Sequence, residues 1–171
     1  MNLRELIKSA IFTAILCAIS PFTIPLGVIP VSLCSFGVYL SAIILKPLYA
    51  TLSVLLYVAI GILGVPVFSG ANGGVGVIIG PTGGFVFGYI ICALLVSVLK
   101  SRTKTTVALI FGTFVLYVCG VVWFSLVTKN SLFYAFIVCV LPFLLGDAVK
   151  IAIATVAGEK INKRLQKNRG F

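Results

Sequence analysis

Residues 106–127, TVALIFGTFVLYVCGVVWFSLV, form a run of 22 residues without a single charged side chain. About 20 apolar residues are enough for an α-helix to cross the hydrocarbon core of a bilayer. The rest of the chain has the same character, because 61% of its 171 residues are hydrophobic and only 9% are charged. Soluble domains usually carry about 25% charged residues, so this composition predicts a chain that is solvated by lipid.

Prolines, glycines and charges divide the sequence on either side of this run into segments. We expect one all-α membrane domain over residues 1–171, with six transmembrane helices at residues 3–20, 31–45, 48–64, 84–99, 106–127 and 142–167. Residues 131–141 are also apolar but are followed by Pro142 and Gly146, so we interpret them as a short, partly embedded helix. Residues 21–30 hold three prolines, including Pro25, and no charge, which indicates an ordered loop or wall.

The basic residues predict the orientation of this domain. If the N-terminus is cytoplasmic, 11 of the 13 lie in cytoplasmic segments, Lys129 lies in an outer loop and Lys150 lies within a helix. This distribution follows the positive-inside rule, and an even number of helices places both termini in the cytoplasm. The net charge of +10 therefore indicates orientation in a lipid bilayer and not binding of nucleic acid. The 11 residues are Arg4, Lys8, Lys46, Lys100, Arg102, Lys104, Lys160, Lys163, Arg164, Lys167 and Arg169.

Several side chains on which enzymes depend are missing from the sequence. There is no histidine, and the acidic residues are Glu5, Asp147 and Glu159 alone. This removes His-based triads, His-ligated zinc and paired-carboxylate hydrolysis. The five cysteines are scattered through apolar stretches with no CxxC spacing, so we expect buried, inert thiols. The chain is not expected to be an enzyme or to carry a cofactor.

Asp147 and Lys150 form the first candidate site. An ionisable group inside a membrane segment costs several kcal/mol unless it is paired or solvated, so its presence suggests a function. The i, i+3 spacing puts both side chains on one helix face, within reach of each other or of a common ligand. We expect them in the first turns of the sixth helix, near the outer surface. A structural ion pair, with Asp147 also satisfying the positive helix end, is the alternative.

A glycine-rich loop is expected on the outer side, over residues 65–83. Eight glycines fall between Gly70 and Gly88, and glycine permits sharp turns and close approach of the backbone. Such a loop is suited to cover a small ligand, and Asn72 at its tip can both donate and accept hydrogen bonds. Tight helix packing through small residues is the alternative, and composition favours neither.

Ala10, Ala14 and Ala18 form an i, i+4, i+8 stripe on the first helix. Small residues at this spacing let another helix approach closely. The stripe therefore predicts either packing inside the chain or docking of a partner.

Together these motifs resemble BioY, the family of biotin-binding S components of energy-coupling factor (ECF) transporters. The motifs are residues 29–33 (IPVSL), 57–68 ending in GVPVF, 80–85 (GPTGGF), and 141–147 (LPFLLGD) with Lys150. The resemblance covers nearly the whole chain. It implies a six-helix bundle in the bacterial plasma membrane that captures biotin from outside and docks on a transmembrane T component driven by two ATPases.

The resemblance also implies roles for individual residues. Asn72, Asp147 and Lys150 are implied to hold the ligand, and the alanine stripe is implied to meet the T component. The ureido ring of biotin offers one carbonyl and two N–H groups, which these three side chains can match; alternatively Lys150 faces the valerate carboxylate. Phe68 and Tyr89 are candidates for the apolar wall that the thiophane ring and aliphatic tail need.

Two positions depart from the family pattern. Cys34 stands where glutamine is usual, which weakens a ligand role for this position, and Lys46-Pro47 stand where glycine is common, which affects a turn on the inner side. The sequence contains no ATP-binding motif, so transport is expected to need a separate ATPase module. A stand-alone, ion-driven transporter for biotin or another small vitamin is the alternative, with Asp147 as its proton site. A single carboxylate and the lack of a visible inverted repeat argue against it.

Overall fold

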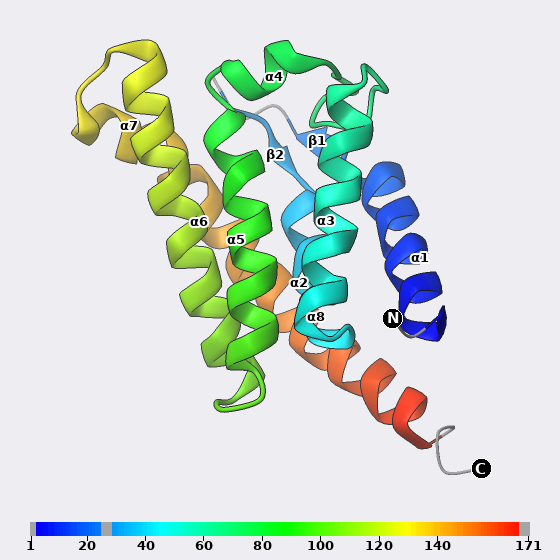
Figure 1. Cartoon of the computed structure of the whole chain (residues 1–171). Helices are drawn as coiled ribbons and strands as arrows, with labels where there is room; N and C mark the ends of the chain where they lie inside the picture. The colour runs from blue at the N-terminus through cyan, green and yellow to red at the C-terminus, as the bar shows by residue number, and fades with distance from the viewer. Residues whose placement is uncertain (1–2, 25–28, 168–171) are drawn as a thin grey trace.

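The computed structural model describes residues 3–24 and 29–167, and this part of the chain is mainly helical (Figure 1). Pro25 and Arg169 lie outside the described residues. Two short strands, β1 (Thr23–Ile24) and β2 (Val31–Ser32), pair antiparallel. The helices are α1 (Leu3–Ile19), α2 (Cys34–Ile44), α3 (Pro47–Ile62), α4 (Val75–Ile79), α5 (Gly83–Leu99), α6 (Thr105–Thr128), α7 (Leu132–Cys139) and α8 (Leu141–Lys167).

The second helix begins later than the sequence predicts. Residues 31–45 are expected to be helical, but Val31 and Ser32 form β2, and α2 starts only at Cys34. The Ser32 hydroxyl accepts the backbone N–H of Cys34 at 2.9 Å, while Ser32 pairs with Thr23 across the small sheet. Such hydrogen bonds from a side chain to the backbone compete with the backbone hydrogen bonds of a helix. The all-α expectation is therefore wrong for this one pair of strands.

The predicted outer loop over residues 65–83 also contains a helix, the five-residue α4. The other helices lie within two residues of their predicted limits. By length and composition, residues 105–128 and 141–162 are long and apolar enough to cross a membrane, and residues 34–44, 47–62 and 83–99 form shorter apolar helices.

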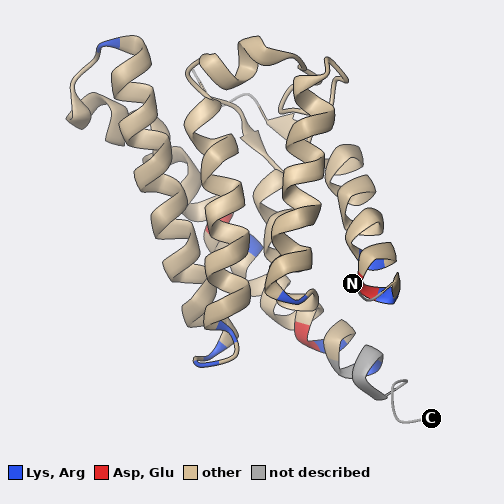
Figure 2. Ribbon diagram, in the orientation of Figure 1, with Lys and Arg blue, Asp and Glu red and all other residues tan. Residues whose placement is uncertain are grey.

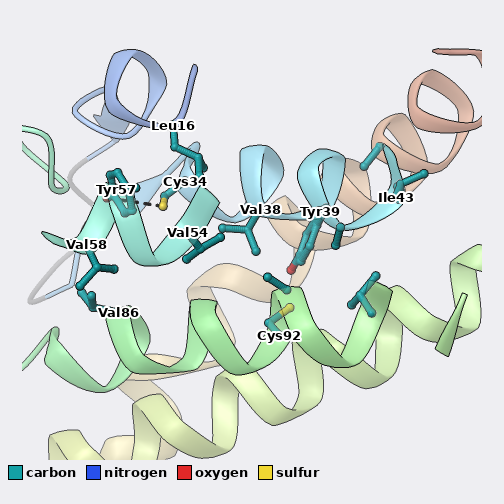
Figure 3. Close-up of a cluster of buried hydrophobic side chains, with 14 of the residues drawn as sticks. Leu16, Cys34, Val38, Tyr39, Ile43, Val54, Tyr57, Val58, Val86 and Cys92 are labelled. Carbon is teal, nitrogen blue, oxygen red and sulfur yellow. Dashed lines mark hydrogen bonds between the residues drawn. The ribbon is translucent and has the colours of Figure 1, made fainter. Parts of the chain in front are cut away.

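The core of the bundle surrounds α2, which packs against α1, α3, α5 and α8. Its residues Val38, Tyr39 and Ala42 are fully buried, and Figure 3 shows Val38 facing Val54 of α3 and Tyr39 facing Cys92 of α5. Lipid tails are as apolar as these side chains, so close packing rather than escape from water holds helices together in a membrane. Gly88 of α5 illustrates this, because a Cβ there would lie 2.7 Å from the Leu116 side chain of α6.

One end of the bundle carries the N-terminus, the α5–α6 loop and the end of α8, and the other carries α4 and the α6–α7 loop (Figure 1). At the first end, the Lys100 ammonium donates hydrogen bonds of 2.6–2.7 Å to the carbonyls of Ala42, Ile43 and Leu45. These carbonyls lie in the last turn of α2 and at its C-cap Leu45, where carbonyls lack partners within the helix, so a cation is well placed there.

The α7 helix packs back against α6 instead of leaving the bundle. Ala135 of α7 is fully buried, and the rings of Phe124 and Tyr134 lie 6.4 Å apart. Because of this return, α8 begins well below the end of α6 in Figure 1. The path of α7 therefore determines the depth at which the first turns of α8 lie.

Candidate ligand-binding site

A cavity of about 240 Å³ lies between the glycine-rich segment and the middle of the bundle. It is lined from β2, α2, α3, α5, α6 and α8, together with α4 and the segment that precedes it. The five residues expected to contact a ligand all line it, namely Phe68, Asn72, Tyr89, Asp147 and Lys150. Residues up to 82 positions apart in the sequence, from Phe68 to Lys150, thus meet at one place.

The inner wall of the cavity is a polar cluster, here called the floor, which consists of Ser32, Ser35, Tyr117, Asp147 and Lys150. Asp147 Oδ1 accepts hydrogen bonds from Lys150 Nζ at 3.0 Å and from the Ser35 hydroxyl at 3.3 Å. The Tyr117 hydroxyl donates to the other carboxylate oxygen, Oδ2, at 2.7 Å. Both Asp147 and Lys150 are buried, with 3% and 9% of their surface exposed.

Lys150 uses its hydrogen-bonding capacity within the floor. Its ammonium donates to the Ser32 carbonyl at 2.8 Å, to the Ser35 hydroxyl at 3.0 Å and to Asp147. An ammonium has three N–H donors, so all of them have partners. A carboxylate oxygen has two lone pairs, so Asp147 Oδ2, with one partner, keeps one acceptor position. The Asp147–Lys150 pair in the floor is therefore neutral overall, its donors all have partners, and one acceptor position on Asp147 is left for a ligand.

The depth of the pair differs from the sequence prediction. Asp147 and Lys150 do lie in the first turns of α8, but not near the end of the bundle. Asp147 bonds to Tyr117, which lies 12 residues after the start of α6 at Thr105 and 11 before its end at Thr128. The expectation of a position near the outer surface is therefore wrong, because α7 returns along α6 and α8 starts partway down.

The opposite wall of the cavity is the segment 64–82, here called the lid. Phe68 anchors it: the side chain is 1% exposed and its ring meets that of Tyr57 edge to face at 5.6 Å. Gly61 of α3 lies directly beneath, and a Cβ there would overlap the Phe68 ring. The Phe68 N–H donates to the Asn72 carbonyl at 2.9 Å, which closes a tight turn.

The tip of the lid is open to its surroundings. Asn72 is exposed, and its amide donates to the Ser69 carbonyl at 2.9 Å. Gly70 and Gly74 have φ of +73° and +91°, which glycine adopts without strain, and Ala71 has φ +58°. The lid tip thus consists of a backbone shaped by glycine and a single amide side chain that faces the cavity.

The far end of the lid is tied to α6 by Trp123. Its indole N–H donates to the Gly80 carbonyl at 3.0 Å. Gly83 and Gly84 of α5 pack so closely on the Trp123 side chain that a Cβ at either would overlap it. The sequence left open whether this stretch covers a ligand or packs helices, and the structure divides it, since its first part lines the cavity and its last part packs α5 on α6. Sequence reasoning missed Trp123, although it is the only tryptophan in the chain.

Aromatic side chains form much of the rest of the cavity wall. Phe85 and Phe143 stack with ring centroids 5.8 Å apart, and Tyr57 and Tyr89 line the cavity beside them. Cys34, the departure from the family pattern, is buried with its thiol 3.6 Å from the hydroxyl of Tyr57. Such a wall suits the apolar part of a small ligand.

The alanine stripe lies on the outside of the bundle. Ala10, Ala14 and Ala18 are all exposed, whereas Ser9 and Thr13 face α3 and donate to the carbonyls of Tyr49 and Ser53 at 3.0 Å. The stripe is therefore not used for packing inside the described part of the chain. This removes one of the two interpretations that the sequence left open.

A bundle of apolar helices that encloses a cavity with a polar, ion-paired floor and an aromatic wall is the architecture of a small-molecule binding protein of the membrane. The family is shown by the match of residues 1–167 to the model of the BioY family. The chain belongs to the BioY family, which confirms the resemblance found in the sequence.

Individual relatives agree with this assignment. The chain is 34% identical over 165 residues to a protein of Thermotoga maritima named biotin transporter BioY, covering 94% of this chain and 97% of that one. It is 33% identical to a probable biotin transporter BioY of Pyrococcus horikoshii, covering 94% and 98%. Among solved structures, the S component for biotin from an ECF-type ABC transporter matches with a TM-score of 0.87, 27% identity and 95% coverage of both chains.

Proposed function

We propose that this chain is the substrate-binding S component of an ECF-type transporter and that it captures biotin from outside the cell. One observation carries the proposal: in a member of the BioY family, Asn72, Asp147 and Lys150 line a single cavity. The chain binds and hands over its ligand without changing it, so it is not an enzyme. ATP-driven uptake requires a T component and two ATPase subunits.

In this proposal six helices span the membrane, namely α1, α2, α3, α5, α6 and α8, with both termini in the cytoplasm. The basic residues support it, because most of those that the structure describes gather at the end with the α5–α6 loop and the termini, while Lys150 lies in the floor (Figure 2). Lys129 lies at the opposite end, in the α6–α7 loop. The lid then faces the outside, and ligand enters from there.

The floor favours one orientation of biotin. Because the three Lys150 donors have partners and Asp147 neutralises its charge, a ligand carboxylate there would add an unpaired charge in a buried site. The neutral ureido ring fits better, with one N–H directed to the open acceptor position on Asp147 Oδ2. The valerate carboxylate then points to the lid, where Asn72 and backbone N–H groups can receive it.

Ligand analogues test this orientation. Biotin methyl ester lacks the negative charge but keeps the ureido ring, so we expect its affinity to lie within about tenfold of that of biotin. If Lys150 instead pairs with the carboxylate, the ester should lose the ~1.5–3 kcal/mol of a hydrogen bond to a charged group, or more than tenfold. Isothermal titration of the purified chain in detergent distinguishes the two orientations.

The T component is proposed to dock on the alanine stripe of α1. The support is that Ala10, Ala14 and Ala18 are exposed and that small residues at this spacing let another helix approach closely. Ala14→Trp should therefore block ATP-driven uptake while biotin binding stays unchanged. Val122→Trp, exposed on α6 at the other edge of the bundle, is the control and should transport normally. Equal loss of biotin binding in Ala14→Trp would mean that the stripe supports the fold instead.

The central experiment is a biotin titration on the purified chain. Binding at nanomolar to micromolar concentration is expected, and its absence would overturn the substrate assignment. Uptake in cells with and without an ATPase module then separates the S component from the stand-alone alternative. Uptake that persists without any such module would favour an ion-driven transporter.

A further inference from the structure

A second cavity, of about 490 Å³, is an open groove between α6 and α8 on the outside of the bundle. We call it the lateral groove. Its walls are one face of each helix, because the lining residues of both recur three or four positions apart. Phe114 and Ile110 of α6 are more than half exposed, and Ala148 and Ala152 of α8 leave space opposite them.

The groove follows from the course of α8. This helix packs mainly on α2 and runs away from α6 toward the cytoplasmic end, as Figure 1 shows. The two helices therefore separate below the level of Asp147. The small side chains of Ala148 and Ala152 do not fill the widening space. An apolar groove of this kind, in a chain solvated by lipid, needs an occupant that excludes water.

We propose that the lateral groove binds one acyl chain of an anionic phospholipid whose phosphate lies at the α5–α6 loop. On α6 the groove extends from Thr106 to Tyr117, or about 16 Å at ~1.5 Å per residue, which suits a long hydrocarbon chain. Its cytoplasmic end lies next to Arg102 and Lys104, which are exposed and precede α6. Basic residues at the cytoplasmic surface attract anionic headgroups.

The charge of this region favours a lipid of one kind. The sequence contains no acidic residue between Glu5 and Asp147, so the α5–α6 loop has no acidic residue of its own. A headgroup with a net negative charge complements the basic α5–α6 loop. A zwitterionic headgroup, whose ammonium balances its phosphate, complements this loop less. The phospholipid also does not compete with the T component, because α1 and α6 lie at opposite edges of the bundle (Figure 1).

The lateral groove and the ligand cavity share two residues, Asp147 and Tyr117. The 2.7 Å hydrogen bond between them separates the two spaces. A bound acyl chain thus covers the back of the floor and keeps water from the Asp147–Lys150 pair. This inference rests on the membrane orientation given under the proposed function and not on the identity of the ligand.

Native mass spectrometry of the whole chain, released from detergent with added phosphatidylglycerol or phosphatidylcholine of identical acyl chains, tests the proposal. We expect one phosphatidylglycerol to bind at least tenfold more tightly than phosphatidylcholine. Ala152→Phe should fill the groove and weaken this binding at least tenfold. Ile153→Phe, on the next residue but outside the groove, should leave it within twofold. Equal affinity for both lipids, or equal effects of both variants, would overturn the proposal.

A measurement on the unaltered chain avoids any folding defect of a variant. A phosphatidylglycerol with a diazirine midway along one acyl chain should label residues within 106–117 or 144–152. Label spread over other exposed apolar positions, such as Ile11 or Leu55, would overturn the proposal, as would a dimer linked through the groove. Because these readouts contain no biotin, failure of the substrate assignment leaves them interpretable.

Discussion

The floor and the lid of the cavity are built in opposite ways. In the floor, Asp147 and Lys150 are buried and joined to Ser35 and Tyr117 by side-chain hydrogen bonds. In the lid, Asn72 is exposed, and the backbone turns through glycines with positive φ. The floor holds its polar groups in position before ligand arrives, and the lid offers a backbone that can adjust around it.

This difference assigns separate tasks to the two walls. Pre-positioned groups lower the cost of ordering on binding and reject ligands that leave a buried group without a partner. A glycine-rich cover contributes less to selectivity but can open and close. Disturbing the floor should therefore cost affinity through electrostatics, and disturbing the lid should cost less and act through shape.

Asp147→Asn should have the largest effect. It keeps the size of the side chain but leaves the Lys150 ammonium buried beside a neutral amide. Loss of one partner of a buried pair costs ~3–5 kcal/mol. Because the floor has to bind the ligand as well as fold, we expect biotin affinity to fall at least about a hundredfold, measured by titration calorimetry. The thermal midpoint of the protein in detergent should fall as well.

The double variant Asp147→Asn/Lys150→Met separates these two effects. It removes both charges, so the thermal midpoint should recover in large part while biotin binding stays weak. An Asp147→Asn protein that binds biotin within threefold of the unaltered chain would mean that the pair is only a structural one.

Tyr117→Phe should have the next largest effect. It removes the 2.7 Å hydrogen bond to Asp147 Oδ2 and keeps the ring that lines the cavity. Hydrogen bonds to charged groups are worth ~1.5–3 kcal/mol, which corresponds to a loss of about ten- to hundredfold in affinity. Tyr134→Phe is the control for the loss of a tyrosine hydroxyl, because Tyr134 lies on α7 and does not line the cavity. This variant should bind biotin as the unaltered chain does. Unchanged binding in Tyr117→Phe would show that this bond does not support the floor.

How much of the floor the sequence could predict depends on the type of residue. Asp147 and Lys150 stand out because charged side chains are rare inside apolar segments. Ser35 and Tyr117 do not, since serine and tyrosine are common in such helices, and they lie 112 and 30 positions from Asp147 in the chain. Only the packing of α2 and α6 on α8 brings them to the carboxylate.

The prediction of depth failed for a similar reason. Hydropathy marks residues 131–141 as apolar, but it does not show that α7 turns back along α6. That return follows from the fit of Ala135 and Tyr134 on α6, which is a property of the packed structure. In the lid, by contrast, the glycines mark the segment in the sequence, although composition alone did not decide between covering a ligand and packing helices.

Gly61→Ala tests the lid without touching a polar group. The added methyl would overlap the Phe68 ring and displace the anchor of the lid. Overpacking of this kind costs ~1–3 kcal/mol, so we expect biotin affinity to fall by about tenfold, with faster dissociation in a stopped-flow measurement. Gly76→Ala is the matched control, because a Cβ there meets nothing within 4 Å. If both alanines act alike, the anchoring of Phe68 does not govern the lid.

Asn72→Ala should have the smallest effect of the four, although Asn72 is one of the three polar residues implied to hold the ligand. Its backbone carbonyl, which binds the Phe68 N–H, remains in the variant, so the turn of the lid persists. The loss is one hydrogen bond at an exposed position, or ~0.5–1.5 kcal/mol, and the affinity should fall up to about tenfold. Val75→Ala, exposed on the adjacent α4, should leave binding unchanged. A loss in Asn72→Ala as large as that in Asp147→Asn would contradict the division of tasks, because the lid would then select the ligand as strongly as the floor does.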